Sequence, residues 1–536
     1  RSLILSPNLW MLNRWMVIGS DVPYSFNGLW CTDSRVTELD LSNSGLACEF
    51  SYVFWLFGLE KIETLKLKSN AFYGNLSYIE GNNVVCSNVF TTVDLSTNKL
   101  QEPLANNLLG LCKTMESLNL SSNKLSNPTE VSSFGLGSVK NLDVSDNGLI
   151  GDSILASVFS NCKNLESLDL SHNTISGFTP GLIRGCSALG YLDLSFNNIS
   201  GNISGFGDYS SLKLLDLSSN FLTDLGDTCK TLQELDFSTN NITSTIPSTF
   251  SACLSLHTIN LSNNQLTGTF PSDVISSITS LRNLVLAYNN ISGSVPVFLA
   301  NFTNLEVLDL SSNHPSGTIP SSLCHSTSPH PLQKLYLYKN MLTGSLPSQI
   351  AECTQIRSLD LSFNYLNGTI HVSLGSLGYL RYFVMWLNHL EGEIPNGLFH
   401  SGSLENLMLD NNLITGAIPY GLNICNNFVW LSLSSNRLTG TIASGIGQLE
   451  KLAVLQLENN SLSGVIPLEL ENYKSLIWLD LNNNKLQGSI PVELSKQPGK
   501  LRQEVCHVSP RATQPASHTV MTLNDEEDIP FFLQQC

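Results

Sequence analysis

Hydrophobic and polar positions recur with a fixed period over much of the chain. Between residues 332 and 491 they follow the unit L-x-x-L-x-L-x-x-N-x-L-x-G-x-I-P. The Asn of this unit recurs every 24 residues, at Asn340, Asn364, Asn388, Asn412, Asn436, Asn460 and Asn484. One L-x-x-L-x-L is common by chance, whereas seven copies in register predict a stack of similar structural units.

Each unit is expected to contain one short strand followed by a turn. In the last copy, Leu479 and Leu481 alternate and should point inward, which leaves Ile477 and Trp478 on the concave side. The amide of Asn484 can satisfy backbone groups at the turn and in the next coil. A period of about 20–29 residues with this pattern is typical of a leucine-rich repeat solenoid. We therefore expect an α/β repeat solenoid with a parallel sheet on its concave face.

The same frame extends almost to the N-terminus. Earlier marker positions are Asn70, Asn98, Asn123, Asn147, Asn173, Asn197, Asn220, Asn240, Asn264, Asn289 and Asn313, and Ser44 stands at the first, degenerate one. These positions give 19 repeats and predict three segments: an N-terminal cap at 1–34, the solenoid at 35–497 and a non-repeat tail at 498–536. Imperfect positions include Pro315 in place of Leu and His371 in place of Pro.

The two end segments lack the repeat pattern. The first carries Leu5, Trp10, Leu12, Trp15 and Ile18, which we expect to cover the open end of the first coil. The tail contains the acidic run 525–528, which is either a calcium site or, as its composition favours, a solvated segment. No signal peptide and no run of about 18 apolar residues is present, so we expect a processed or excised chain without a membrane span.

The 13 cysteines divide by position. Seven stand three residues before the first apolar position of a repeat and are expected to be buried free thiols: Cys112, Cys162, Cys186, Cys229, Cys253, Cys353 and Cys425. Disulfides are then expected among the other six, without an assignable pairing: Cys31, Cys48, Cys86, Cys324, Cys506 and Cys536.

Ten N-x-S/T sequons favour a secreted, extracellular glycoprotein. Asn119 and Asn260 should face the concave side, where sugar would block the surface. The expected glycosylation sites are therefore Asn75, Asn198, Asn202, Asn241, Asn290, Asn301, Asn367 and Asn459. The net charge of −17 argues against nucleic acid and anionic membranes as partners.

Motifs for catalysis are missing. The pairs Gly135/Gly137, Gly205/Gly207 and Gly445/Gly447 lack the third Gly of a dinucleotide loop and are read as turn glycines. No H-E-x-x-H, G-x-S-x-G or phosphate-binding loop occurs. His325 and His330 flank a Ser/Pro-rich insertion but are too few to predict a metal site. We expect neither enzymatic activity nor a cofactor.

Large aromatic residues occupy concave positions in many repeats: Tyr288, Tyr336, Tyr338, Phe363, Tyr382, Trp386, Trp430 and Trp478. Exposed aromatic clusters are typical of binding surfaces. The alternative is that neighbouring rings stack along the sheet. For the C-terminal aromatic residues as a group, we favour the interpretation that they form a binding surface.

The Leu-x-Gly-x-Ile-Pro unit resembles the extracellular repeats of plant receptor kinases, receptor-like proteins and polygalacturonase inhibitors. The segments LSFNYLNGTI (361–370), WLNHLEGEIP (386–395) and SLIWLDLN (475–482) are similar to the brassinosteroid receptor and its paralogues. The stretch from Trp15 to Cys31 resembles the cap of these receptors, although Tyr24 stands where their first cap cysteine is expected.

This resemblance implies a right-handed superhelix with a steroid pocket between late repeats and an inserted island domain. It places Ile477 and Trp478 on the pocket floor. The expected ligand-binding residues are Ile477, Trp478, Trp430, Trp386, Phe363, Tyr338 and Tyr336. Residues after Lys500 do not resemble the island, so we expect a chain truncated before the island, the membrane span and the Ser/Thr kinase.

Three hypotheses remain open from the sequence. The first is the extracellular ligand-recognition domain of a brassinosteroid-receptor-like kinase, which would bind a steroid or another small apolar ligand together with a co-receptor kinase ectodomain. The second is a soluble interaction protein, such as a receptor-like protein or polygalacturonase inhibitor, with a secreted protein as its partner. The third is the product of a disrupted receptor gene.

Overall fold

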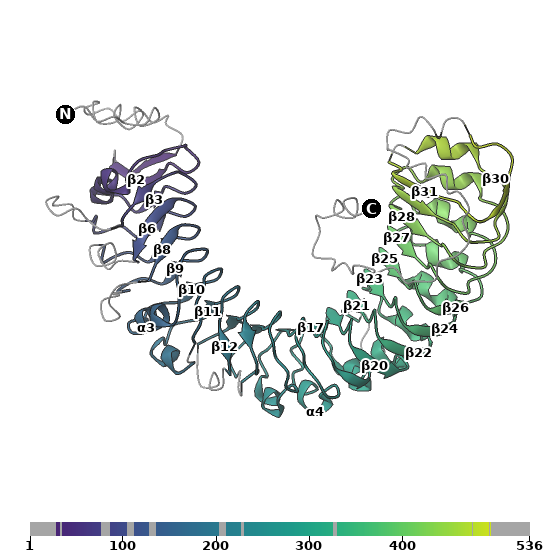
Figure 1. Ribbon diagram of the computed structural model, residues 1–536, viewed down its shortest axis with the longest axis horizontal. Helices are drawn as coiled ribbons and strands as arrows, with labels where there is room; N and C mark the ends of the chain where they lie inside the picture. The colour runs from purple at the N-terminus through teal and green to yellow at the C-terminus, as the bar shows by residue number, and fades with distance from the viewer. Residues whose placement is uncertain are drawn as a thin grey trace, which may run out of the picture.

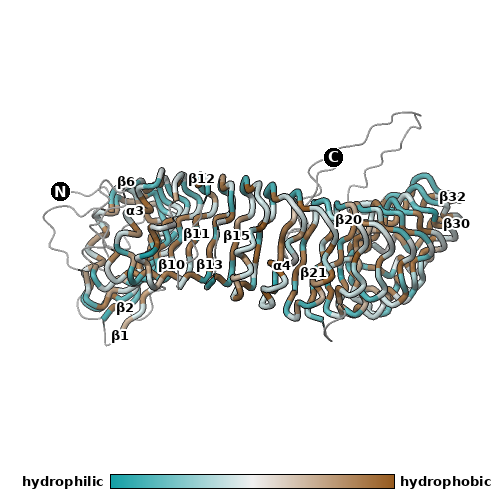
Figure 2. The backbone as a smooth tube through the Cα atoms, turned by 90° about the horizontal axis from the view of Figure 1, so that it is seen from below, coloured by the Kyte–Doolittle hydropathy of each residue, from teal (hydrophilic) through white to brown (hydrophobic). Residues whose placement is uncertain are grey.

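The computed structural model is a curved solenoid of stacked coils (Figure 1). It describes residues 28–32, 35–76, 86–103, 112–127, 136–178, 180–202, 211–226, 230–324, 330–473, 475–491 and 494. One long sheet follows the inner side of the curve, and short helices lie on the outer side (Figure 1). Hydrophobic stretches recur at the same place in successive coils (Figure 2). The predicted leucine-rich repeat solenoid is confirmed.

The inner sheet has 20 strands. Every pairing in it is parallel except that of β1 with β2, which is antiparallel. In spatial order the strands are β1 (Leu29–Thr32), β2 (Arg35–Asp40), β3 (Thr64–Lys66), β5 (Thr92–Asp94), β7 (Ser117–Asn119), β9 (Asn141–Asp143), β10 (Ser167–Asp169), β11 (Tyr191–Asp193), β13 (Leu214–Asp216), β15 (Glu234–Asp236), β16 (Thr258–Asn260), β17 (Asn283–Val285), β19 (Val307–Asp309), β21 (Lys334–Tyr336), β23 (Ser358–Asp360), β25 (Tyr382–Val384), β27 (Asn406–Met408), β28 (Trp430–Ser432), β29 (Val454–Gln456) and β31 (Trp478–Asp480).

Small sheets continue some of the coils after the turn. They are β4 (Tyr73–Gly74) with β6 (Lys99–Pro103) and β8 (Lys124–Ser126); β12 (Ser200–Gly201) with β14 (Phe221–Leu222); β18 (Ser292–Ser294), β20 (His314–Gly317), β22 (Met341–Ser345), β24 (Tyr365–Thr369) and β26 (His389–Glu391); and β30 (Ser463–Val465) with β32 (Lys485–Gln487). We call the five-stranded one, β18 to β26, the lateral sheet.

Short helices complete the return path. The α-helices are α3 (Ser153–Phe159) and α4 (Ser272–Ile275). The 3₁₀-helices are η1 (Phe50–Tyr52), η2 (Phe54–Gly58), η4 (Pro180–Gly185), η6 (Ser248–Ala252), η7 (Val297–Asn301), η8 (Ser321–Cys324), η9 (Ser348–Glu352), η10 (Val372–Ser376), η11 (Asn396–Phe399), η12 (Tyr420–Ile424), η13 (Ser444–Gln448) and η14 (Leu468–Asn472).

One continuous hydrophobic core runs through the stack. In the coil of β23 and β24, Leu359, Leu361, Leu366 and Ile370 are all buried, and equivalent residues of the neighbouring coils contact them. A short strand and a short helix cannot bury their apolar side alone. The stability of each coil therefore comes from its neighbours.

The marker amides join neighbouring coils. The Nδ2 group of Asn364 donates to the carbonyl oxygens of Leu337 at 2.9 Å and Leu361 at 3.1 Å, while its Oδ1 accepts from the N–H of Leu342 at 3.0 Å. Leu337 and Leu342 lie in the preceding coil. The expectation that the amide reaches into the next coil is therefore wrong in direction, because the turn carries the side chain back over the coil already formed.

The residue before each marker takes a left-handed backbone conformation. Nineteen non-glycine residues of the described part have positive φ, from Asn43 at 55° to Asn483 at 49°, and each one precedes a marker position. Such a conformation costs roughly 1 kcal/mol or more outside glycine. The hydrogen bonds of the following Asn hold the turn against this cost.

The cysteine prediction was largely wrong. Disulfides join Cys86 to Cys112, Cys162 to Cys186 and Cys324 to Cys353, with Cα atoms 5.1, 4.8 and 5.1 Å apart. Cys253 is also disulfide-bonded. A position that recurs once per coil lies directly beside its equivalent in the next coil, so two consecutive repeats with Cys there place the sulfurs in bonding range.

The remaining described cysteines are free. Cys425 is buried and free, as expected from the repeat position, and Cys31 and Cys48 are free although a disulfide was expected for them. Burial raises the pKa of the Cys425 thiol to about 11, which keeps it protonated. Cys229, Cys506 and Cys536 lie outside the described residues.

At the N-terminal end, β1 covers the edge of the sheet. It pairs with β2 from Leu29 opposite Leu39 to Thr32 opposite Arg35. An antiparallel partner satisfies the backbone groups that an edge strand would leave unpaired. The expected cap residues 5–24, His325 and the acidic run 525–528 lie outside the part of the chain that the structure describes.

Candidate ligand-binding surface on the concave face

The cross-strand register aligns the concave side chains in rows. Trp430 of β28 lies opposite Val454 of β29, which lies opposite Trp478 of β31. On the other side, Asn406 of β27 lies between Trp430 and Tyr382 of β25. The predicted aromatic residues therefore fall into two groups separated by β27.

The first group comprises Tyr288, Tyr336, Tyr338, Phe363, Tyr382 and Trp386, all of which are half-buried. The hydroxyl of Tyr338 donates to that of Tyr288 at 3.1 Å, and their rings meet edge to face. Phe363 and Trp386 also pack edge to face, with ring centroids 4.8 Å apart. These two pairs pack as the stacking alternative predicts.

The second group presents more free apolar surface. Trp478 is 43% exposed and Ile477 is 40% exposed, whereas Val454 is buried between Trp478 and Trp430. We call Trp430, Val454, Ile477 and Trp478 the apolar platform. Rings held on the strands of one sheet offer a large, rigid contact area. The platform can therefore receive a flat apolar molecule.

Buried carboxylates adjoin the aromatic residues. Asp360 accepts hydrogen bonds from the N–H and the hydroxyl of Ser362, at 3.0 and 2.6 Å. Burial raises the pKa of Asp360 to about 6. Burial also raises the pKa values of Asp309, Asp410 and Glu458. The Asp-x-Ser motif at the ends of their strands signals the pairs of Asp309 and Asp360 in the sequence, whereas Asp410 binds Ser432 and Ser434 of the next coil and has no such local motif.

An acidic ladder crosses the N-terminal half of the concave face. Asp143, Asp169, Asp193, Asp216 and Asp236 lie directly opposite one another on five successive strands. Like charges at this spacing oppose folding unless a proton or a cation reduces the repulsion. Burial and neighbouring carboxylates raise the pKa of Asp216 to about 6. The ladder is thus suited to cationic groups.

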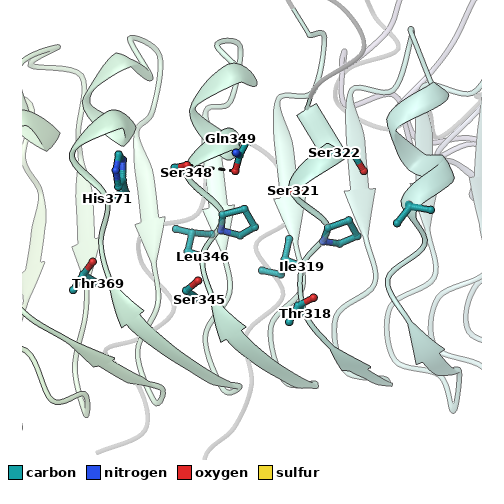
Figure 3. A pocket seen from close by; sticks show the side chains of 13 residues that line it. Thr318, Ile319, Ser321, Ser322, Ser345, Leu346, Ser348, Gln349, Thr369 and His371 are labelled. Carbon is teal, nitrogen blue, oxygen red and sulfur yellow. Dashed lines mark hydrogen bonds between the residues drawn. The ribbon is translucent and has the colours of Figure 1, made fainter.

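A hollow of about 620 Å³ lies outside the concave face, across the coils that carry β20, β22 and β24. Hydroxyl groups line it, together with the rings of two prolines and His371 (Figure 3). None of the predicted ligand-binding residues lies there. His371 is also the N-cap residue of η10, where its Nδ1 accepts from the N–H of Ser373 at 3.1 Å.

The sequons differ in accessibility. The eight expected glycosylation sites are exposed, whereas Asn119 and Asn260 are half-buried. Asn260 is fully engaged, since its Nδ2 donates to Asp236 at 2.8 Å and its Oδ1 accepts from the hydroxyl of Ser262 at 2.8 Å. Glycosylation of the eight sites stays a prediction.

Two searches of the described residues were negative. No three His, Cys, Asp or Glu residues gather there in a way that could hold a metal ion. In the same residues, no helix has the length and apolarity needed to cross a bilayer.

Family models agree with the fold. Leucine rich repeat models match residues 111–128, 152–199, 230–291, 279–324, 355–377, 427–449 and 475–497. The molecule is therefore a leucine-rich repeat protein.

Proteins of similar sequence indicate which class of leucine-rich repeat protein this chain resembles. The chain is 40% identical over 385 residues to the receptor-like protein kinase BRI1-like 3 of Arabidopsis thaliana, a match that covers 66% of this chain and 33% of that protein. It is 40% identical over 142 residues to the protein BRASSINOSTEROID INSENSITIVE 1 of the same plant, covering 26% and 12%. The chain thus spans a third or less of the length of these relatives.

A solved structure extends the likeness over most of the fold. The plant peptide hormone receptor RGFR1, in complex with RGF2, has a TM-score of 0.68 and 28% identity, covering 88% of this chain and 85% of that one. The expected resemblance is confirmed: this chain is similar to the leucine-rich repeat ectodomains of plant receptor kinases, and its sequence relatives include brassinosteroid receptors.

Proposed function

We propose that this chain is the extracellular recognition part of a plant receptor kinase and that its apolar platform binds a steroid of the brassinosteroid class. The observation that carries the proposal is the exposure of Ile477 and Trp478 at the start of β31, in a row that continues through Val454 of β29 to Trp430 of β28. An isolated exposed leucine needs no explanation, but a tryptophan platform in water does.

The shape and chemistry of the platform support a flat apolar ligand. Trp430, Val454 and Trp478 lie on strands and Ile477 directly precedes β31, so the surface is held in place before the ligand arrives, and little side-chain entropy is lost on binding. Removal of one ring from such a platform typically costs more than about 1 kcal/mol of binding free energy. The disulfides are consistent with an extracellular location.

Calorimetric titration of the purified chain with brassinolide tests the proposal. We expect binding that Trp478→Ala weakens about tenfold or more. Tyr420→Ala is the matched control, because Tyr420 is 75% exposed but starts η12, away from the concave sheet. Binding that both variants leave unchanged, or no binding at high ligand concentration, would refute a steroid role for the platform.

A second candidate is a cationic polypeptide partner bound along the acidic ladder. The observation in its favour is the alignment of five aspartates on successive strands. Capture of a basic protein from cell-wall extract would support it if Asp193→Asn with Asp216→Asn abolished the capture while Trp478→Ala did not. Capture unaffected by the aspartate changes would exclude the ladder as the docking surface.

A further inference from the structure

An exposed aromatic side chain on the lateral sheet has no packing explanation. Tyr365 begins β24 and is 57% exposed. Its ring stacks on another exposed ring, that of His389 on β26, with centroids 6.2 Å apart and planes 22° from parallel. Such a pair leaves an aromatic face open to contact with a further group.

The same strand presents a glycosylation sequon beside this ring. In the β24 sequence Tyr-Leu-Asn-Gly-Thr, the side chains of Tyr365, Asn367 and Thr369 are exposed while Leu366 is buried. Residues two apart on a strand point to the same side of the sheet. Asn367 also lies opposite His389 in the register. The amide is therefore flanked by both rings of the stacked pair.

There is room for a sugar at this place. Ser345 lies opposite Asn367 on β22, and Ser345 and Thr369 both border the outer hollow of about 620 Å³ (Figure 3). The hydroxyl-rich lining of this hollow offers donors and acceptors to a carbohydrate.

We propose that Asn367 carries an N-linked glycan whose first sugar stacks on the ring of Tyr365. The glycan comes from a lipid-linked oligosaccharide pyrophosphate. A bond forms between Asn367 Nδ2 and C1 of the sugar, the bond from C1 to the pyrophosphate oxygen breaks, and the amide proton leaves with the lipid pyrophosphate. Tyr365 then buries the apolar face of the sugar, and His389 supports the ring from the neighbouring strand.

The chain offers a matched control for this arrangement. Asn241 belongs to the sequon Asn-Ile-Thr and is exposed, but the residue two positions before it is Thr239. A glycan at Asn241 lacks the preceding aromatic ring. The difference between the two sites therefore isolates the contribution of Tyr365.

The test uses the full chain secreted from plant cells. Glycopeptide mass spectrometry should find sugar on Asn367. Hydrogen exchange of the β24 and β26 amides then follows the local opening equilibrium. Asn367→Gln should lower protection about 2- to 10-fold, the range expected for a ring stacking contact. In a chain that already carries Tyr365→Thr, Asn367→Gln should lower this protection less than about 2-fold. In a chain with Tyr365→Phe, Asn367→Gln should lower the protection as much as it does in the chain with Tyr365.

Two results would overturn the proposal. One is an Asn367 without sugar in the secreted protein. The other is an equal loss of protection on Asn367→Gln with and without the ring at position 365. Asn241→Gln should change the hydrogen-exchange protection of the amides around position 241 by less than about 2-fold, because a glycan at that site has no ring contact to lose. Threonine is favoured on exposed strands, so Tyr365→Thr should preserve β24 itself.

Discussion

The side-chain oxygen of Asn340 accepts a hydrogen bond from the backbone N–H of Asn313, 3.0 Å away. In the next coil, the corresponding Asn364 accepts from the N–H of Leu342 instead. The difference arises at Pro315, which stands at the Leu position and has no N–H to donate. One irregular residue thus redirects the bond that joins two coils.

Pro315→Leu should therefore stabilise the coil of β20. The new N–H can donate to Asn340, and the larger side chain fills the small void that Pro315 lines with Phe270 and Ile291. These gains should exceed the entropy cost of losing a proline and raise the local free energy of opening by about 1 kcal/mol. Hydrogen exchange of β20 and β22 measures it. His314→Leu, at the exposed neighbouring position, is the control; faster exchange in Pro315→Leu would contradict the argument.

Removal of a regular marker should have the opposite effect. In Asn364→Ala, the carbonyl of Leu337 and the N–H of Leu342 lose their partner inside the core. We expect a loss of roughly 3 kcal/mol in the unfolding free energy of the surrounding coils, at the upper end for an unsatisfied buried group. Denaturant unfolding checks this value. Asn426→Ala, at an exposed turn position, should change it by less than about 0.5 kcal/mol.

Differential alkylation should separate the cysteines into two classes. In the folded protein without reductant, Cys324, Cys353, Cys162 and Cys186 should resist alkylation, and unfolding alone should not expose them. Cys425 should react on unfolding without reductant, since it is free but buried. Mass spectrometry of the labelled peptides gives the answer. Labelling of Cys324 before reduction would show that its disulfide does not form.

The sequence predicts the fold well, because the repeat spacing shows which residues take equivalent positions in successive coils. The Asn spacing alone fixes which leucines share the core and that Ile477 and Trp478 face the concave side. It does not show which residues of neighbouring coils touch. Cys162 and Cys186 look like equivalent core positions in the sequence, and only stacking brings them together. For the same reason, the packing of Phe363 on Trp386 and the bond between Tyr338 and Tyr288 could not be predicted from each repeat separately.

The free energy of unfolding should fall as the pH rises from about 4 to 6, because buried carboxyl groups with raised pKa values lose their protons in the folded state over this range. Asp216 and Asp360 have folded pKa values of about 6, above the ordinary value for aspartate, so the folded state binds their protons more tightly than the unfolded state. Protonation therefore favours folding, and this advantage is lost as the pH passes through 6. For each carboxyl we expect a loss of about 1 kcal/mol between pH 5 and 7.5.

Denaturant unfolding across this pH range tests the effect. Asp360→Asn should reduce the change in unfolding free energy over this pH range by the contribution of one carboxyl group, because the amide cannot ionise. Asp146→Asn is the exposed control and should leave the slope unchanged. An unfolding free energy that rises between pH 5 and 7.5 in the unmodified chain, with no change of slope in Asp360→Asn, would show that Asp360 does not retain its proton preferentially in the folded state.

Because each marker amide bonds to the preceding coil, a coil completes its hydrogen bonds only after the next coil has been synthesised. The N–H of Leu342 and the carbonyl of Leu337 are satisfied by a side chain that stands at position 364, on the following coil. During synthesis, a coil that has just left the ribosome therefore lacks part of its hydrogen bonding until the ribosome has added the next marker. Folding of the growing chain should consequently trail synthesis by about one repeat, and a translational pause after a marker will leave a more complete stack than a pause before it.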